Sequence, residues 1–154
     1  MEKGLEIEHL DVETAFLQGE LEEQVYIQQP EGYVDPHHPD LVCRLKKAIY
    51  GLKQSGRVWN VKLGSILNEM GLQRCEYDPC LYHLQRSGAE LKMAVFVDDL
   101  LVFASSRALI QEVTAELRKR ITLRDLGDIT RCFNVNVTRD REREEFYLWT
   151  NGIA

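Results

Sequence analysis

Two adjacent aspartates, Asp98 and Asp99, interrupt an otherwise apolar run from Met93 to Phe103. Carboxylates within such a run raise the free energy of the folded state unless something compensates for their burial. A strand, a turn carrying both carboxylates and a returning strand would place them at the end of a sheet, where a divalent cation could neutralise them. We therefore predict an antiparallel hairpin with Asp98 and Asp99 at its turn.

A third carboxylate, Asp11, stands near the end of another strand-like run, Leu5 to Val12. Three carboxylates delivered from two strand ends are typical of sites that bind two hard cations for phosphoryl or nucleotidyl transfer. We therefore expect the end of the Asp11 strand to lie beside the Asp98–Asp99 hairpin.

Composition is that of one globular domain, residues 1–154, with 44% hydrophobic and 29% charged residues. No run approaches the roughly 18 apolar residues of a membrane span, and the first residues lack the apolar segment of a secretion signal. These features predict an intracellular protein, cytoplasmic or nuclear, with no membrane partner. The four cysteines are irregularly spaced in apolar surroundings and are expected to be reduced core thiols.

The net charge of −6 opposes nucleic-acid binding, because Lys and Arg lead contacts with phosphate. Basic residues nevertheless gather in two places, around the start of a predicted helix and at the end of a later one. These are Arg44, Lys46, Lys47, Lys53, Arg57 and Lys62, and then Arg118, Lys119, Arg120 and Arg124. A solvated surface and a phosphate contact remain equally open for both clusters.

Apolar periodicity predicts an α+β fold with mostly antiparallel strands and two long helices. The helices are expected at Ser55–Met70 and from Ser105 or Ser106 to Arg120. Strands are expected at Leu5–Val12, Val25–Gln28, Leu41–Leu45, Pro79–Gln85, Lys92–Val97 and Leu100–Ala104, with a turn at Arg86–Ala89 and a loop at Pro30–Pro39. A final hairpin is expected from Cys132–Thr138 and Phe146–Trp149, joined by the charged turn Arg139–Glu145.

Six blocks of sequence, in order, resemble the reverse transcriptase of copia-type (Ty1/copia) retrotransposons. They are Leu10–Gly19, Leu21–Val34, Cys43–Gln54 followed by Arg57 and Trp59, Asp78–Tyr82, Phe96–Leu101 and Asp125–Gly127. The resemblance covers nearly the whole chain, and six ordered blocks are far more specific than one Asp-Asp pair.

The resemblance implies a polymerase palm, an antiparallel sheet backed by two long helices, with RNA-directed DNA polymerase activity. Asp11, Asp98 and Asp99 would be the catalytic carboxylates and would hold two Mg²⁺ or Mn²⁺ ions, with Asp11 and Asp98 as the principal ligands. The implied partners are an RNA template, a DNA primer and deoxynucleoside triphosphates.

The same resemblance assigns roles outside the carboxylates. Phe16 matches the aromatic residue under the incoming sugar that rejects a 2′-hydroxyl, and Tyr50 and Gly51 match the border of the nucleotide pocket. Lys53 and Arg57 are implied to contact nucleic-acid phosphate. From the residues alone, Phe16, Tyr50 and the nearby Trp59 are more typical of core aromatics, and with the resemblance Trp59 stays in the core.

A zinc site formed by Cys75, Cys80 and His83 is disfavoured, because their spacing is not that of a zinc knuckle. Two stretches depart from the family pattern. Ser55-Gly56 replaces Ala-Pro beside the pocket segment, and Asn134 and Asn136 replace a glycine and an acidic residue.

Relative to the family, most of the fingers and the thumb are missing, so we expect a palm fragment that is inactive alone. The alternative is a non-catalytic retrotransposon remnant that serves as a nucleic-acid or protein interaction module. Persistence of all three carboxylates favours the polymerase. An unrelated metal-dependent phosphotransferase would require the six ordered blocks to arise by chance.

Overall fold

The computed structural model describes residues 5–132, 135–140, 143 and 145–150. The chain divides into two units. The first unit comprises Met1–Glu13 and Ile66–Ala154, and the second comprises Thr14–Ser65. Whether residues 1–154 behave as one domain, as their composition predicts, stays a prediction.

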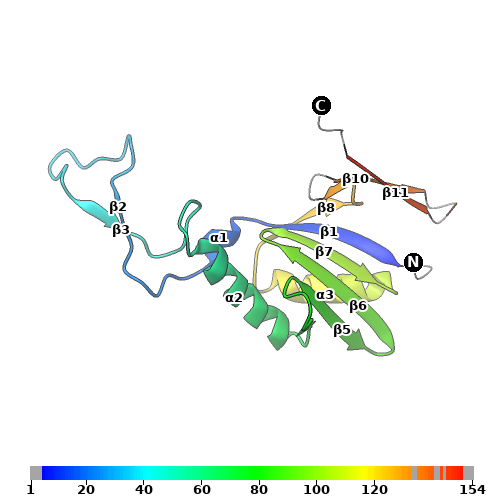
Figure 1. The fold of residues 1–154 in the computed structure, drawn as a ribbon. Helices are drawn as coiled ribbons and strands as arrows, with labels where there is room; N and C mark the ends of the chain where they lie inside the picture. The colour runs from blue at the N-terminus through cyan, green and yellow to red at the C-terminus, as the bar shows by residue number, and fades with distance from the viewer. Residues whose placement is uncertain (1–4, 133–134, 141–142, 144, 151–154) are drawn as a thin grey trace. The chain divides into compact units, whose positions relative to one another are not determined.

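A six-stranded antiparallel sheet organises the first unit, with strand order β4-β5-β6-β7-β1-β8 (Figure 1). The strands are β1 (Glu6–Val12), β4 (Gln73–Arg74), β5 (Leu81–Arg86), β6 (Ala89–Phe96), β7 (Asp99–Ala104) and β8 (Leu123–Gly127). Strand β1, from the start of the sequence, thus lies between β7 and the edge strand β8.

Both predicted hairpins of this sheet are confirmed. In the first, β5 and β6 are joined by Ser87 and Gly88, whose φ angles are 53° and 80°. Positive φ at both central residues is the signature of a type I′ turn, whose twist matches that of the flanking strands. In the second, β6 and β7 pair through Phe96 and Asp99, so that the turn consists of Val97 and Asp98. The expectation that Asp99 also lies at the turn is wrong, because it pairs with Phe96 as the first residue of β7.

Helix α3 (Arg107–Arg118) packs against β6 and β7 and closes the core of this unit (Figure 1). Its apolar residues recur every three or four positions, which gathers them on one face of the helix. The sheet contributes alternate strand residues to the same core. The fully buried members include Leu10, Leu91, Met93, Leu100, Val102, Ile110 and Leu117. The observed class is therefore α+β with a mostly antiparallel sheet, as predicted.

A separate three-stranded antiparallel sheet has the order β11-β10-β9, with β9 (Arg131–Cys132), β10 (Val135–Asp140) and β11 (Glu145–Trp149). The predicted final hairpin is confirmed by the β10–β11 pairing. The expectation of one strand over Cys132–Thr138 is wrong, because Cys132 pairs with Val135 and the two belong to different strands. Asn134 and residues 141, 142 and 144 of the expected turn lie outside the described residues.

The second unit contains α1 (Ala15–Gln18), the ribbon of β2 (Tyr26–Gln28) and β3 (Val42–Arg44), and most of helix α2 (Ser55–Glu69). The predicted helix and both predicted strands are confirmed, the strands in shorter form. Trp59 of α2 is 2% exposed, as expected of a core residue. The four-residue α1 was not predicted.

All four cysteines are free thiols. The expectation that they are core thiols is wrong for two of them, since Cys43 and Cys80 are exposed. Cys43 lies in the two-stranded ribbon, where no third strand pairs, and Cys80 precedes β5 in a turn. Among the helices that the structure describes, none has the length and apolar character needed to cross a membrane.

Candidate active site

The tip of the β6–β7 hairpin has an unusual backbone. Val97 adopts a φ of 55°, although a β-branched residue strongly disfavours the left-handed region. Such a conformation costs about 1–3 kcal/mol and persists where its surroundings hold it in place. One such restraint is the backbone amide of Val12, which donates a hydrogen bond to the carbonyl oxygen of Asp98 at 2.8 Å.

Strand register brings two of the three predicted carboxylates together. Asp11 of β1 is the direct partner of Asp99 of β7, and on its other side it is the partner of Arg124 of β8. Directly opposed residues of antiparallel strands project from the same face of the sheet. The prediction that the Asp11 strand ends beside the hairpin tip is therefore confirmed, with Asp98 in the adjoining turn.

Each of the paired carboxylates has a cationic or hydrogen-bonding partner. Oδ2 of Asp11 lies 3.2 Å from Nη2 of Arg124, whose side chain is 62% exposed. Oδ1 of Asp99 lies 2.8 Å from Nε2 of His9, whose side chain is only 9% exposed. Because an ionised carboxylate can only accept a hydrogen bond, Nε2 of His9 carries the hydrogen and donates it.

Asp98 differs from the other two carboxylates. It is exposed at the turn, and its side chain makes no hydrogen bond or ion pair with the residues that the structure describes. Its backbone is nevertheless held by the Val12 amide. The turn thus fixes the backbone position of Asp98 and leaves its carboxylate accessible to an external ligand.

The donor set is of the kind that hard divalent cations prefer, since such ions bind carboxylate oxygens. Within the described parts of the chain, no three His, Cys, Asp or Glu side chains gather closely enough to hold a metal ion. Oδ1 of Asp11 and Oδ2 of Asp99 each lack a hydrogen-bond or ion-pair partner among the described residues. Chemically the residues fit such an ion, with one uncommitted oxygen on each paired carboxylate.

Cys132 of β9 adds a buried thiol near this site. Burial, with a further contribution from the negative charge of Asp99, raises the pKa of Cys132 to about 11. The thiol is therefore protonated at neutral pH and is a poor metal ligand, because the thiolate is the binding form. Cys132 was not among the residues predicted for this site.

The remaining predicted site residues all belong to the second unit. Phe16 and Tyr50 contact each other as stacked rings, with centroids 6.3 Å apart and planes 27° apart. Gly51 has a φ of 94°, a conformation that side chains rarely adopt. Lys53 and Arg57 are exposed, Lys53 before α2 and Arg57 in its first turn. The structure thus brings together the two aromatic residues predicted for the nucleotide pocket.

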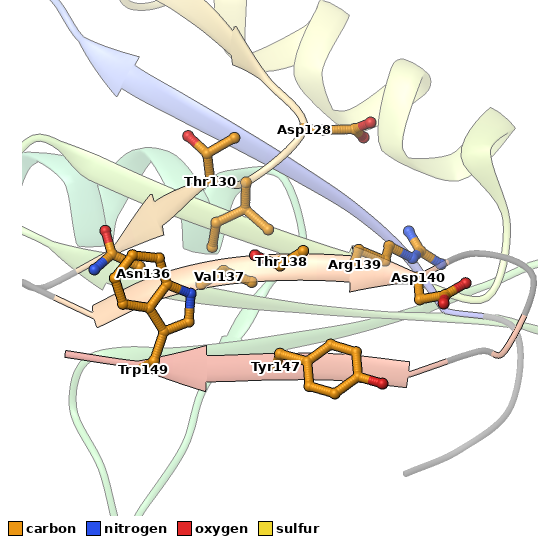
Figure 2. Close-up of a pocket in the computed structure, with 10 residues that line it drawn as sticks. Asp128, Thr130, Asn136, Val137, Thr138, Arg139, Asp140, Tyr147 and Trp149 are labelled. Carbon is orange, nitrogen blue, oxygen red and sulfur yellow. The ribbon is translucent and has the colours of Figure 1, made fainter. Parts of the chain in front are cut away.

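A groove of about 790 Å³ lies between the loop that precedes β9 and the β10–β11 hairpin (Figure 2). Two cross-strand pairs, Asn136 with Trp149 and Thr138 with Tyr147, contribute to its wall. None of the predicted site residues lines it. This groove was not predicted, because the residues that line it carry no recognisable motif.

Comparison with known proteins gives consistent matches over most of the chain. Residues 1–148 match the family described as reverse transcriptase (RNA-dependent DNA polymerase). The chain is 35% identical over 145 residues to the retrovirus-related Pol polyprotein from transposon TNT 1-94 of Nicotiana tabacum, which covers 94% of this chain and 11% of that protein. It is 38% identical over 139 residues to the corresponding polyprotein from transposon RE2 of Arabidopsis thaliana, covering 90% of this chain and 10% of that protein.

A shorter relative is the putative transposon Ty5-1 protein of Saccharomyces cerevisiae, 38% identical over 128 residues. That alignment covers 83% of this chain and 42% of the yeast protein. The chain therefore spans about a tenth of the length of the two plant polyproteins and less than half of the yeast relative.

Proposed function

The chain belongs to the reverse transcriptase family of copia-type retrotransposons, and on that premise we propose that it forms the palm of an RNA-directed DNA polymerase. The proposed reaction is nucleotidyl transfer, in which a primer 3′-hydroxyl attacks a deoxynucleoside triphosphate on an RNA template. The resemblance found in the six sequence blocks is thereby confirmed at the level of the family. The palm assignment and the reaction are proposals.

One observation carries this proposal more than any other. Asp11 and Asp99 are register partners on one face of the sheet, and the turn that holds Asp98 is tied to the Asp11 strand through Val12. Two opposed carboxylates with a third in the adjoining turn suit a reaction in which negative charge develops on phosphate oxygens.

We assign Asp11, Asp98 and Asp99 as ligands for two Mg²⁺ or Mn²⁺ ions, with Asp11 and Asp98 as the principal ones. Bound ions of this kind supply charge stabilisation for the attacking and leaving oxygens of an in-line displacement. The contribution of the chain itself is positional. The backbone restraint on Asp98 and the register of Asp11 with Asp99 fix the main-chain positions from which the carboxylates project before substrate arrives.

The second unit supplies the proposed contacts with substrate. Phe16 is assigned to the sugar of the incoming nucleotide, where an aromatic face leaves no room for a 2′-hydroxyl and so favours DNA synthesis. The stacked Tyr50 and the adjoining Gly51 are assigned to the border of the same pocket. The exposed cations Lys53 and Arg57 are assigned to template or primer phosphate.

We propose that residues 1–154 alone do not extend a primer. Magnesium sites of this type are completed by substrate phosphates, and the chain covers only about a tenth of the plant polyproteins that it matches. Metal binding by the isolated chain should therefore be weak, and the nucleic acid should need contacts from neighbouring parts of a longer polyprotein.

A graft tests the proposal. Residues 1–154 replace the equivalent segment of an active copia-type enzyme, and primer extension on an RNA template is measured with the graft, its Asp98→Asn variant and its Glu90→Gln variant. Glu90 is a matched control, because it is a carboxylate of the same sheet whose side chain pairs, among the described residues, only with Lys92, at 3.4 Å. We expect extension by the graft and the control, and none by Asp98→Asn.

Two results would contradict this assignment. Full activity of Asp98→Asn in a live graft would exclude the proposed role of the carboxylates. A folded but inactive graft would instead favour the remnant hypothesis, in which the altered stretch at Ser55-Gly56 or at Asn134 and Asn136 has ended catalysis and an interaction role remains.

A further inference from the structure

The two paired carboxylates are anchored by partners of very different mobility. Arg124, the partner of Asp11, has a long side chain that is 62% exposed. His9, the partner of Asp99, has a short side chain that is only 9% exposed. A surface arginine can withdraw into water at little cost, whereas an imidazole that is 9% exposed can replace only little of its hydrogen bonding with water.

The location of His9 explains its rigidity. It lies two residues before Asp11 on β1, so the two side chains project from the same face of the strand. Its register partner is Leu101 of β7, which is 6% exposed and two residues from Asp99. His9 therefore reaches Asp99 diagonally across the β1–β7 pair, beside the buried Leu101.

This hydrogen bond has a consequence for the geometry of Asp99. With Oδ1 held by His9 at 2.8 Å, rotation of the carboxylate is restricted and Oδ2 is the oxygen left without a partner among the described residues. A ligand contributing one oriented oxygen loses less entropy on binding a cation than a freely rotating carboxylate.

We propose that His9 is the positioning residue for Asp99, fixing it as a ligand through a single oxygen, while Arg124 is a displaceable counter-cation at Asp11. This inference rests on the proposed function, because it assumes that the carboxylates bind divalent cations. It gives roles to two residues outside the proposed ligand set. It also separates Asp99, which stays anchored, from Asp11, which can offer both oxygens once Arg124 withdraws.

The test measures Mn²⁺ affinity of the full 154-residue chain by electron paramagnetic resonance, with Mn²⁺ taken to millimolar concentrations. His9→Leu removes the donor and should weaken Mn²⁺ binding by about tenfold, the lower end of the effect of losing such a supporting hydrogen bond. His9→Gln keeps an N–H donor of similar reach and should retain wild-type affinity. Arg124→Gln should strengthen binding, because it removes a positive charge that competes for Asp11.

A double-mutant cycle separates positioning from general damage to the fold. In an Asp99→Asn background, His9→Leu should cause no further loss of Mn²⁺ affinity, since the group it positions is gone. Circular dichroism of each variant verifies folding. If His9→Leu does not fold, His9→Asn replaces it, because the same amide on a shorter side chain cannot reach Asp99 and should also weaken binding.

The outcomes distinguish this inference from the proposed function. If Asp11→Asn and Asp98→Asn leave Mn²⁺ affinity unchanged, or if the wild-type chain binds no Mn²⁺, the metal site itself is wrong. If those variants lose binding while folded His9→Leu or His9→Asn retains it, only the role of His9 is overturned. Equal losses from His9→Gln and His9→Leu would also overturn it, because the hydrogen-bond donor would then be irrelevant.

Discussion

The two units position their predicted site residues by different means. In the first, Asp11 and Asp99 lie in the interior strands of a six-stranded sheet, where neighbouring strands fix their register on both sides. In the second, Tyr50 and Gly51 lie in a turn, and Phe16 in a four-residue helix. A residue fixed by register is secured by the whole sheet, whereas one fixed by a turn depends on a few local contacts.

This difference predicts where the chain tolerates change. Substitutions of buried residues in the strands that carry Asp11 and Asp99 should lower the stability of the six-stranded sheet. Substitutions on the β2–β3 ribbon of the second unit should change stability little. The exposure of Tyr26 and Val42 on that ribbon, 52% and 55%, points the same way, because little apolar area is buried there.

The largest effect is expected from Leu100→Ala. Leu100 is 0% exposed and pairs with Leu10 in the centre of the sheet, so truncation should cost about 2–5 kcal/mol through lost burial and a cavity. The matched control is Leu41→Ala in the second unit, where the leucine is 60% exposed; its effect should stay within about 0.5 kcal/mol. Urea unfolding followed by circular dichroism measures both, and equal effects would refute the proposed difference between the units.

The reactivity of one cysteine in each unit allows the units to be compared without any substitution. Cys132 of the first unit has a pKa raised to about 11 and is buried, whereas Cys43 of the second unit is exposed. At pH 8 in native buffer, Cys132 should react with iodoacetamide at least about tenfold more slowly than Cys43, because each unit of pKa changes the thiolate fraction tenfold. Peptide mass spectrometry over time gives both rates, and rapid labelling of Cys132 would contradict its burial and its raised pKa.

Much of the first unit follows from its sequence, for a physical reason. Burial of one sheet face imposes a period of two on β5 and on most of β6, and the interruption of the apolar run by Asp98 and Asp99 marks the turn before β7. Strand β8 could not be found in this way, because its residues are mostly exposed and show no apolar alternation. Arg124 was accordingly noted only as part of a basic cluster, although β8 places it against Asp11.

The sequence contains a signal for His9 that did not enter the prediction of the site. Its spacing of two from Asp11 in a predicted strand puts both on one face, which makes it a candidate partner for any carboxylate on the neighbouring strand. What the sequence could not supply is the register that brings Asp99 within 2.8 Å, since register depends on long-range pairing of β1 with β7. In the second unit, similarly, the Phe16–Tyr50 contact joins residues 34 positions apart with no periodic pattern between them.

Two glycines test how strongly the second unit depends on local geometry. Gly51 has a φ of 94°, so Gly51→Ala should destabilise the chain by about 1 kcal/mol, although no atom lies within 4 Å of the added Cβ. Gly56 lies in α2 with the same open surroundings and no positive φ. Gly56→Ala should therefore stabilise by about 0.5–1 kcal/mol. Thermal unfolding measures the stability change of both variants. If both substitutions stabilise the chain, or both destabilise it, backbone strain at Gly51 is not the cause.

The smallest expected effect concerns a weak point within the first unit. Glu8 of β1 is paired with the fully buried Val102, and burial, followed by the nearby charge of Asp125, raises the pKa of its carboxyl above 4.5. A raised carboxyl pKa means that the folded state binds more protons than the unfolded state, so stability falls as pH rises from about 4.5 through the folded pKa.

Glu8→Gln should thus be slightly more stable than the wild type at pH 7, and the gain should vanish near pH 4, where the wild-type carboxyl is also neutral. Urea midpoints at the two pH values measure this. An equal gain in stability at both pH values would show that the gain comes from packing and not from the charge of Glu8.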